Sequence, residues 1–195
     1  MSEKEVRNYK AVLPYEVFAM AFSSKPSYKQ RLAVGSFAES DKNQVSVIQC
    51  DEKTGNFKTN LTFDHKFPCA KLMWIPDLDD AHPDLLVTAS ETLKIWTIRD
   101  NSSHELTSSL KPSSSKNEER AAPLTSFDWN NQYLNIIVTS SVDTTCSIWD
   151  ISTGSVIKQL IAHDKEVFDV NFSPDANVFA TVGNDGSVRK FDSRD

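Results

Sequence analysis

The sequence predicts an all-β fold, a β-propeller of antiparallel four-stranded blades. A succession of three apolar strands recurs along the chain, and the third strands contain the similar segments KIWT, SIWD and RKFD, with a fainter VSVIQ before them. The aromatic residues that close the first strands lie 52, 55 and 43 residues apart. These aromatic residues are Phe22, Trp74, Trp129 and Phe172. A propeller blade occupies about 40–45 residues plus loop insertions, so the spacing indicates one blade for each repeat.

Period-two alternation between turn residues gives the strands of each unit in order. The first blade, residues 15–63, has predicted strands at residues 17–22, 31–37, 44–50 and 57–62. The second, residues 64–111, has them at 70–74, 85–89, 93–98 and, more weakly, 105–110. The third, residues 121–162, has them at 124–129, 136–140, 146–150 and 156–161. The fourth, residues 163–195, has them at 167–171, 178–182 and 187–191 and lacks an outer strand.

The segments between the strands add two expectations. Residues 51–55 and 150–154 share a D-x-x-T-G pattern directly after a third strand, where glycine supplies the positive φ of a tight turn. Residues 100–120 are polar and rich in serine, and they predict a long mobile loop. This loop is a tolerated insertion or, given the three serines at 113–115, a phosphorylation or docking loop.

Composition narrows the class of partner. The 195 residues are 39% apolar and 25% charged, which is ordinary for a soluble globular protein. The net charge of −6 and the scattered lysines and arginines argue against direct nucleic-acid binding and favour a basic or weakly charged protein partner. Residues 1–10 are too polar for a signal peptide, and no apolar run is long enough to span a membrane. We therefore expect an intracellular location.

Cofactor and metal sites are not expected. The three cysteines, Cys50, Cys69 and Cys146, form no CxxC pair and predict reduced core thiols. The four histidines lack ligand spacing, and the sequence contains no P-loop, Rossmann glycine pattern, HExxH or GxSxG. An enzymatic use of His163 with Asp164 or Asp169 is the weaker alternative, because each of these side chains has a structural role available in a repeat. The four tryptophans all fall on strands, where we expect core packing.

Histidine, threonine, aspartate and tryptophan recur at related positions in the repeats. In propeller repeats that resemble these, such side chains form a buried chain of hydrogen bonds, since a buried imidazole or carboxylate without partners costs roughly 1–3 kcal/mol. The candidates in the second, third and fourth units are His65, Thr88 and Trp96; Thr139, Asp143 and Trp149; and His163, Thr181 and Asp185.

No unit carries the complete set. The fourth unit has Phe191 in place of tryptophan, so its chain of bonds must end at the threonine. The third unit has no histidine in the loop before its first strand. The second unit has Glu91 in a turn that is two residues shorter than the corresponding turns of the third and fourth units.

Several blocks of the sequence resemble one family of WD40 propellers. They are KLMWIPD (71–77), PDLLVTAS (83–90), APLTSFDWN (122–130), SSVDTTCSIWD (140–150) and QLIAHDKEVFDVNFSPD (159–175). The chain is similar, from about residue 15 onward, to the Transparent Testa Glabra type of plant regulator and its animal counterpart that binds DYRK-type kinases. The resemblance implies a non-catalytic scaffold of nucleus and cytoplasm that assembles transcription factors or kinases.

The resemblance also implies an alternative function, as the substrate-receptor subunit of a cullin-RING ubiquitin ligase. Residues 179–194 resemble the WDxR box that docks the damaged-DNA-binding adaptor of cullin-four ligases, and the matching pair is Asp192 and Arg194. The box departs from its pattern at Val182, Lys190 and Phe191. A final arginine that is merely a solvated strand end is the simpler interpretation.

Members of the family that this chain resembles form a closed ring of about seven blades. The sequence therefore predicts an incomplete propeller of about four blades. We expect it to represent an N-terminal part or short form of the scaffold, with exposed faces on the first and fourth blades. The polar N-terminal arm, residues 1–14, is predicted to be poorly ordered at residues 3–12, since no last blade is present for it to complete.

Overall fold

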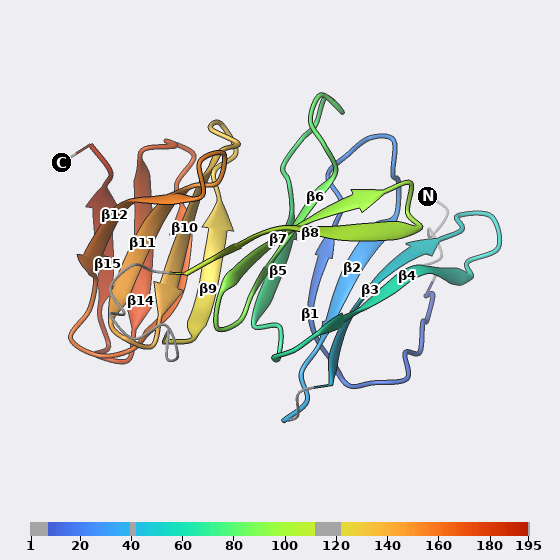
Figure 1. Cartoon of the computed structure of the whole chain (residues 1–195), viewed down its shortest axis with the longest axis horizontal. Coiled ribbons are helices and arrows are strands. Elements are labelled where there is room, and N and C mark those ends of the chain that lie inside the picture. The colour runs from blue at the N-terminus through green and yellow to red at the C-terminus, as the bar shows by residue number, and fades with distance from the viewer. Residues whose placement is uncertain (1–7, 40–41, 112–121, 195) are drawn as a thin grey trace, which may run out of the picture.

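The described residues form fifteen strands in four antiparallel sheets that stand side by side, as the computed structural model in Figure 1 shows. The structure describes residues 8–39, 42–111 and 122–194. The first strands of neighbouring sheets contact one another, β1 with β5, β5 with β9 and β9 with β13. The sheets are therefore arranged as the blades of a β-propeller, which confirms the predicted fold class.

Every predicted strand is present, with ends within three residues of those expected. The first sheet contains β1 (Val17–Phe22), β2 (Arg31–Ser36), β3 (Asn43–Cys50) and β4 (Phe57–His65). The second contains β5 (Lys71–Trp74), β6 (Leu85–Ala89), β7 (Leu93–Arg99) and β8 (Ser103–Leu110). The third contains β9 (Leu124–Trp129), β10 (Ile136–Ser141), β11 (Thr145–Asp150) and β12 (Ser155–Ile161). The fourth contains β13 (Val167–Phe172), β14 (Val178–Gly183) and β15 (Val188–Asp192).

The structure tests two expectations about the segments between the strands, one for the loop after β7 and one for the turn glycines. The expected mobile loop is wrong for its first half, because β8 pairs along β7 and is tied to it by the hydroxyls of Thr97 and Thr107, 2.6 Å apart. The second half of that loop, with its three serines, lies outside the described residues. Both turn glycines do adopt the predicted positive φ, 73° at Gly55 and 69° at Gly154.

The N-terminal arm packs on the first sheet. Leu13 contacts the buried residues of the outer face, among them Val34 and Ile48. The Tyr15 hydroxyl donates to Ser46 Oγ at 2.6 Å. The ring of Tyr9 lies so close to Gly55 that a Cβ there would come within 2.3 Å of it. The expectation of a poorly ordered arm stays a prediction. Residues 8–12 are exposed, apart from the contact of Tyr9 with Gly55, and residues 1–7 lie outside the described part.

The apolar core lies between neighbouring sheets. One cluster joins the first sheet to the second, another joins the second to the third, and another joins the third to the fourth. The four tryptophans are buried in these clusters, as predicted. All three cysteines are free and buried, which confirms the expected core thiols.

Polar side chains also join the sheets, and the sequence did not single them out. Arg31 is fully buried, donates to both carboxylate oxygens of Asp84 at 2.7 and 2.8 Å, and lies between the rings of Tyr28 and Trp74. This ion pair connects the start of β2 to the segment before β6. Between the third and fourth sheets, the carboxylate of Asp128 accepts from the backbone N–H of Phe172 at 2.7 Å.

Candidate functional site

The second blade contains a continuous buried chain of hydrogen bonds. The Trp96 indole N–H donates to Thr88 Oγ1 at 3.0 Å, and Thr88 Oγ1 lies 3.0 Å from His65 Nε2. His65 Nδ1 lies 2.6 Å from the carbonyl oxygen of Phe67. Each link has one donor and one acceptor if His65 is neutral with its proton on Nδ1. Burial lowers the pKa of His65 to about 4, which favours that neutral form. The Phe67 carbonyl oxygen thus takes the place that a carboxylate, Asp185, has in the fourth blade.

The third blade keeps only part of the chain. The Trp149 indole donates to Thr139 Oγ1 at 2.9 Å, and both residues are buried. Asp143 does not join them. Its carboxylate accepts instead from the backbone and hydroxyl of Thr145, at 3.1 and 2.7 Å. The expected place of Asp143 in the network is therefore wrong, because this blade has no histidine to connect the turn with the strand threonine.

The fourth blade connects its turn to its core through His163. His163 Nε2 lies 2.8 Å from Thr181 Oγ1, and Nδ1 lies 2.9 Å from Asp185 Oδ1. The hydroxyl and backbone N–H of Ser187 donate to the same carboxylate. These bonds, together with those from Asp164 and His163, outweigh the effect of desolvation and hold the pKa of Asp185 well below its usual range.

At Thr181, the network of the fourth blade ends differently from the networks of the second and third blades. At the register position of the tryptophans, Phe191 stacks on Phe179 with ring centroids 5.3 Å apart. No indole reaches Thr181. A Cβ at Gly183 would approach the His163 ring to 2.6 Å, so only glycine leaves room for the imidazole there.

The titratable groups of these networks lie in the core. His65 and His163 are fully buried, and the two cysteines whose pKa burial raises to about 12, Cys69 and Cys146, are buried as well. In the described ranges, no three side chains of His, Cys, Asp or Glu gather as ligands for a metal ion. Nor do those residues form a helix of the length and apolarity that crossing a bilayer requires.

The predicted docking pair lies at the exposed end of β15. Arg194 donates through Nε to Asp192 Oδ1 at 2.8 Å, and a second nitrogen pairs with Oδ2 at 2.5 Å. The hydrogen bonds from Arg194 hold the pKa of Asp192 well below its usual range. The Arg194 side chain is 61% exposed, so the pair presents a guanidinium at the surface.

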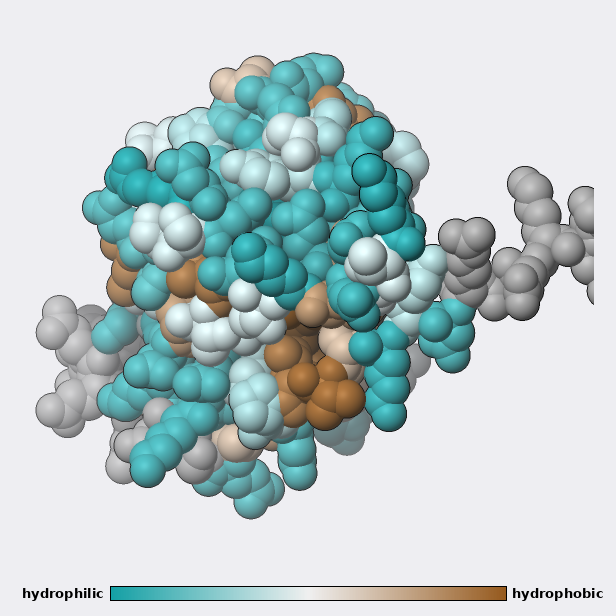
Figure 2. Space-filling view, turned by 90° about the vertical axis from the view of Figure 1, so that its right-hand side faces the viewer, coloured by the Kyte–Doolittle hydropathy of each residue, from teal (hydrophilic) through white to brown (hydrophobic). Residues whose placement is uncertain are grey.

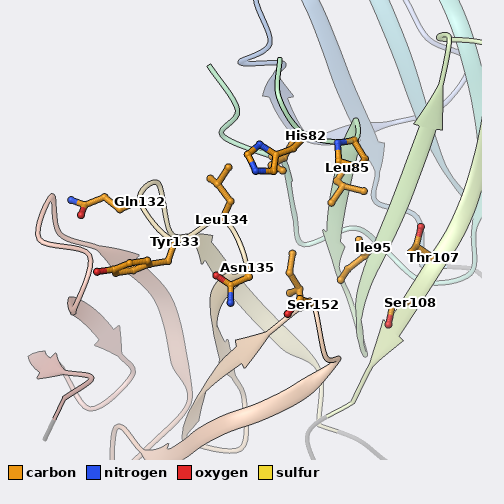
Figure 3. Close-up of a pocket in the computed structure, with 13 residues that line it drawn as sticks. His82, Leu85, Ile95, Thr107, Ser108, Gln132, Tyr133, Leu134, Asn135 and Ser152 are labelled. Carbon is orange, nitrogen blue, oxygen red and sulfur yellow. The ribbon is translucent and has the colours of Figure 1, made fainter. Parts of the chain in front are cut away.

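A cleft of about 510 Å³ opens between the second and third sheets, and we call it the Tyr133 cleft. Leu85 and Ile95 lie on one side and Tyr133 and Leu134 on the other, with the side chains of the two sheets facing each other in Figure 3. Its polar groups are largely engaged, since Gln132 donates to the Pro174 carbonyl at 2.8 Å. The sequence did not predict this cleft, because residues 132–135 and 85–95 come together only when the sheets pack.

The family model for the WD domain, G-beta repeat, matches residues 118–150 and 154–192. The chain contains WD40 repeats. The two matched segments cover most of the third and fourth blades, and the WD40 level of the expected resemblance is thereby confirmed.

Curated relatives resemble the whole of this WD40 chain. It is 45% identical over 195 residues to the DDB1- and CUL4-associated factor 7 homolog of Dictyostelium discoideum. It is also 32% and 36% identical to WD repeat-containing proteins of Saccharomyces cerevisiae and Schizosaccharomyces pombe, over 94% and 98% of its length. The chain spans 58%, 38% and 46% of these three relatives. The finer resemblance to the Transparent Testa Glabra type stays a prediction.

Proposed function

We propose that this WD40 chain is a non-catalytic protein-binding module of a cullin-four ligase assembly, in which it contacts the DDB1-type adaptor. The observation that carries the proposal is the 45% identity, over the full chain, to a protein named as a DDB1- and CUL4-associated factor. The exposed Asp192 and Arg194 pair supports it, because these residues match the end of the adaptor-docking box.

The chemistry of an exposed arginine fits such a contact. A guanidinium presents several donors in a fixed plane and forms strong hydrogen bonds with carboxylates and carbonyls of a partner. Asp192 fixes the guanidinium of Arg194 by two bonds, so less side-chain entropy is lost on docking. Phe191 closes the same strand by stacking on Phe179, which anchors the end of β15.

The test is recovery of a purified DDB1-type adaptor on the immobilised chain, comparing wild type with Arg194→Ala. We expect at least tenfold lower recovery with the variant. Arg99→Ala is the matched control, because Arg99 is equally exposed and pairs with Glu105 on the second blade. Equal recovery with Arg194→Ala and wild type overturns adaptor docking at this position.

A second candidate function is assembly of transcription factors or DYRK-type kinases in nucleus and cytoplasm. The sequence blocks quoted above favour it, and a propeller with several loop faces suits a scaffold. It predicts that a DYRK-type kinase domain binds wild type and Arg194→Ala with equal affinity. Failure of the kinase domain to bind either protein in a titration rejects this candidate without affecting the adaptor proposal.

A further inference from the structure

A second cleft, of about 470 Å³, collects residues from the first three sheets, and we call it the Phe18 cleft. Its lining includes Phe18, Phe37, Phe67, Ser90, Glu91 and Val142. Figure 2 views the molecule from the side on which the first sheet lies and shows a mainly hydrophilic surface interrupted by a hydrophobic area.

The Phe18 cleft and the Arg194 guanidinium lie at opposite ends of the blades. Ser90 and Glu91 form the turn before β7, just as Asp185 belongs to the turn before β15. Arg194 follows the other end of β15, and Ser152 of the Tyr133 cleft follows the corresponding end of β11. A ligand in the Phe18 cleft therefore leaves Arg194 accessible.

Exposed aromatic rings form one wall. Phe18 is 60% exposed and Phe37 is 41% exposed, and their ring centroids are 4.6 Å apart. Val142 contributes an exposed aliphatic side chain from the third sheet. Clustered exposed apolar side chains of this kind mark contact sites, because covering them removes apolar surface from water.

Backbone hydrogen bonds fix the walls before any ligand arrives. The N–H of Leu124 donates to the Ser90 carbonyl at 2.7 Å and joins the third sheet to the second. The N–H of Cys69 donates to the Ser36 carbonyl at 3.2 Å and joins the second to the first. A preformed cleft loses little conformational entropy on binding.

One buried polar group in this cleft lacks a partner. Ser90 is 5% exposed, its backbone N–H donates to Thr92 and its carbonyl accepts from Leu124. Its hydroxyl has no hydrogen-bond partner in the described part of the chain. Buried hydroxyl groups are normally satisfied, so this one is available to a group that enters the cleft.

Charge selects the type of ligand. Glu91 is the single charged residue in the lining as the structure describes it, and its charge also acts on Lys94 of β7. The whole chain carries a net charge of −6. One acidic side chain beside an apolar wall, on a chain of net negative charge, favours a ligand that combines a large apolar side chain with a neighbouring positive charge.

We propose that the Phe18 cleft binds a peptide segment of a partner protein in which one large apolar side chain is flanked by arginine or lysine. The apolar side chain packs against Phe18 and Phe37, a polar group of the peptide pairs with Ser90 Oγ, and the basic residue faces Glu91. This site is independent of adaptor docking through Arg194.

The experiment uses the full chain and fluorescein-labelled peptides in an anisotropy titration. The main probe has the sequence GGRFRGG, and the matched probes replace its phenylalanine by alanine or both arginines by glutamate. We expect saturable binding of the main probe and about tenfold weaker binding of both matched probes. Absence of saturable binding by the main probe overturns the proposal, as does equal binding of the glutamate probe.

Variants place the binding in this cleft. Phe18→Ala and Glu91→Gln should each weaken the main probe by about tenfold. Ser90→Ala should weaken it as well while leaving the urea midpoint unchanged or higher, because the variant removes an unpaired buried hydroxyl. Tyr133→Ala, in the opposite cleft, and Arg194→Ala should bind like wild type. Wild-type affinity in Phe18→Ala, or equal loss in Tyr133→Ala, rejects the cleft as the site.

Discussion

Arg31 and Asp84 form a bidentate ion pair across the junction of the first and second sheets, with the arginine fully buried and the aspartate largely so. The two guanidinium nitrogens lie 2.7 and 2.8 Å from the two carboxylate oxygens. Tyr28 and Trp74 enclose the guanidinium from both sides, with ring centroids 3.7 and 4.0 Å from its carbon. The pair is thus shielded from water, and the junction depends on both partners.

Removing one partner should destabilise the chain strongly. Arg31→Met leaves the Asp84 carboxylate buried without its counterion, and we expect the free energy of unfolding to fall by about 3–5 kcal/mol. Urea denaturation followed by tryptophan fluorescence measures this change. The double variant Arg31→Met/Asp84→Leu should recover most of the loss, and a double variant no more stable than the single one would contradict this account.

Stability should fall on mild acidification because of His65. Its pKa is about 4 in the folded chain and roughly 6.5 when unfolded. The unfolded state therefore binds the proton more readily, so the contribution of His65 is complete above about pH 6.5 and is lost as the pH falls toward 4. The full loss is about 3 kcal/mol. Urea midpoints at pH 7.5, 6 and 4.5 should fall less steeply for His65→Gln than for wild type, and parallel profiles would refute the assignment.

A substitution can supply the fourth blade with the indole hydrogen-bond donor that it lacks beside Thr181. Phe191 pairs with Phe179, two residues before Thr181, in the register that Trp149 has with Ile137 before Thr139. Phe191→Trp should let an indole N–H reach Thr181 and stabilise the chain by about 0.5–1.5 kcal/mol. Phe191→Trp combined with Thr181→Val separates the hydrogen bond from added apolar area. An equal gain in the free energy of unfolding with Thr181 and with Thr181→Val would show that buried apolar area alone is responsible.

The buried thiols should be inert in the native chain. Burial raises the pKa of Cys69 and Cys146 to about 12, which lowers the reactive thiolate fraction by roughly a thousandfold relative to an exposed cysteine. In Cys50→Ala, Ellman's reagent at pH 8 should label the two remaining thiols slowly without denaturant and rapidly in urea. Rapid labelling of the native variant would mean that the blades open readily.

The sequence predicted the strands well because each depends on a local period. Alternating apolar residues and turn glycines such as Gly55 mark strand ends without knowledge of neighbours. The His163 and Thr181 pairing was also predictable, because both residues occupy repeated positions. Asp143 was misjudged since a repeated position does not guarantee that its partner exists.

Contacts between sheets could not be predicted in the same way. Arg31 stands 53 residues from Asp84, and nothing in its immediate sequence distinguishes it from a solvated strand end. The Phe18 cleft likewise draws on three blades, so its residues share no motif. The packing of Tyr9 against Gly55 was missed because a polar arm gives no sign of which surface receives it.

The side-chain contacts between blades differ from the first junction to the last, a bidentate ion pair at the first and a carboxylate to backbone contact at the last. The repeats are thus not interchangeable modules. Replacing the second blade with a copy of the third would preserve each hairpin but remove Asp84 from beneath Arg31. Engineering by duplication or exchange of blades would have to cut the chain inside a sheet and transfer each junction intact, so the transferable unit of this protein is the interface rather than the repeat.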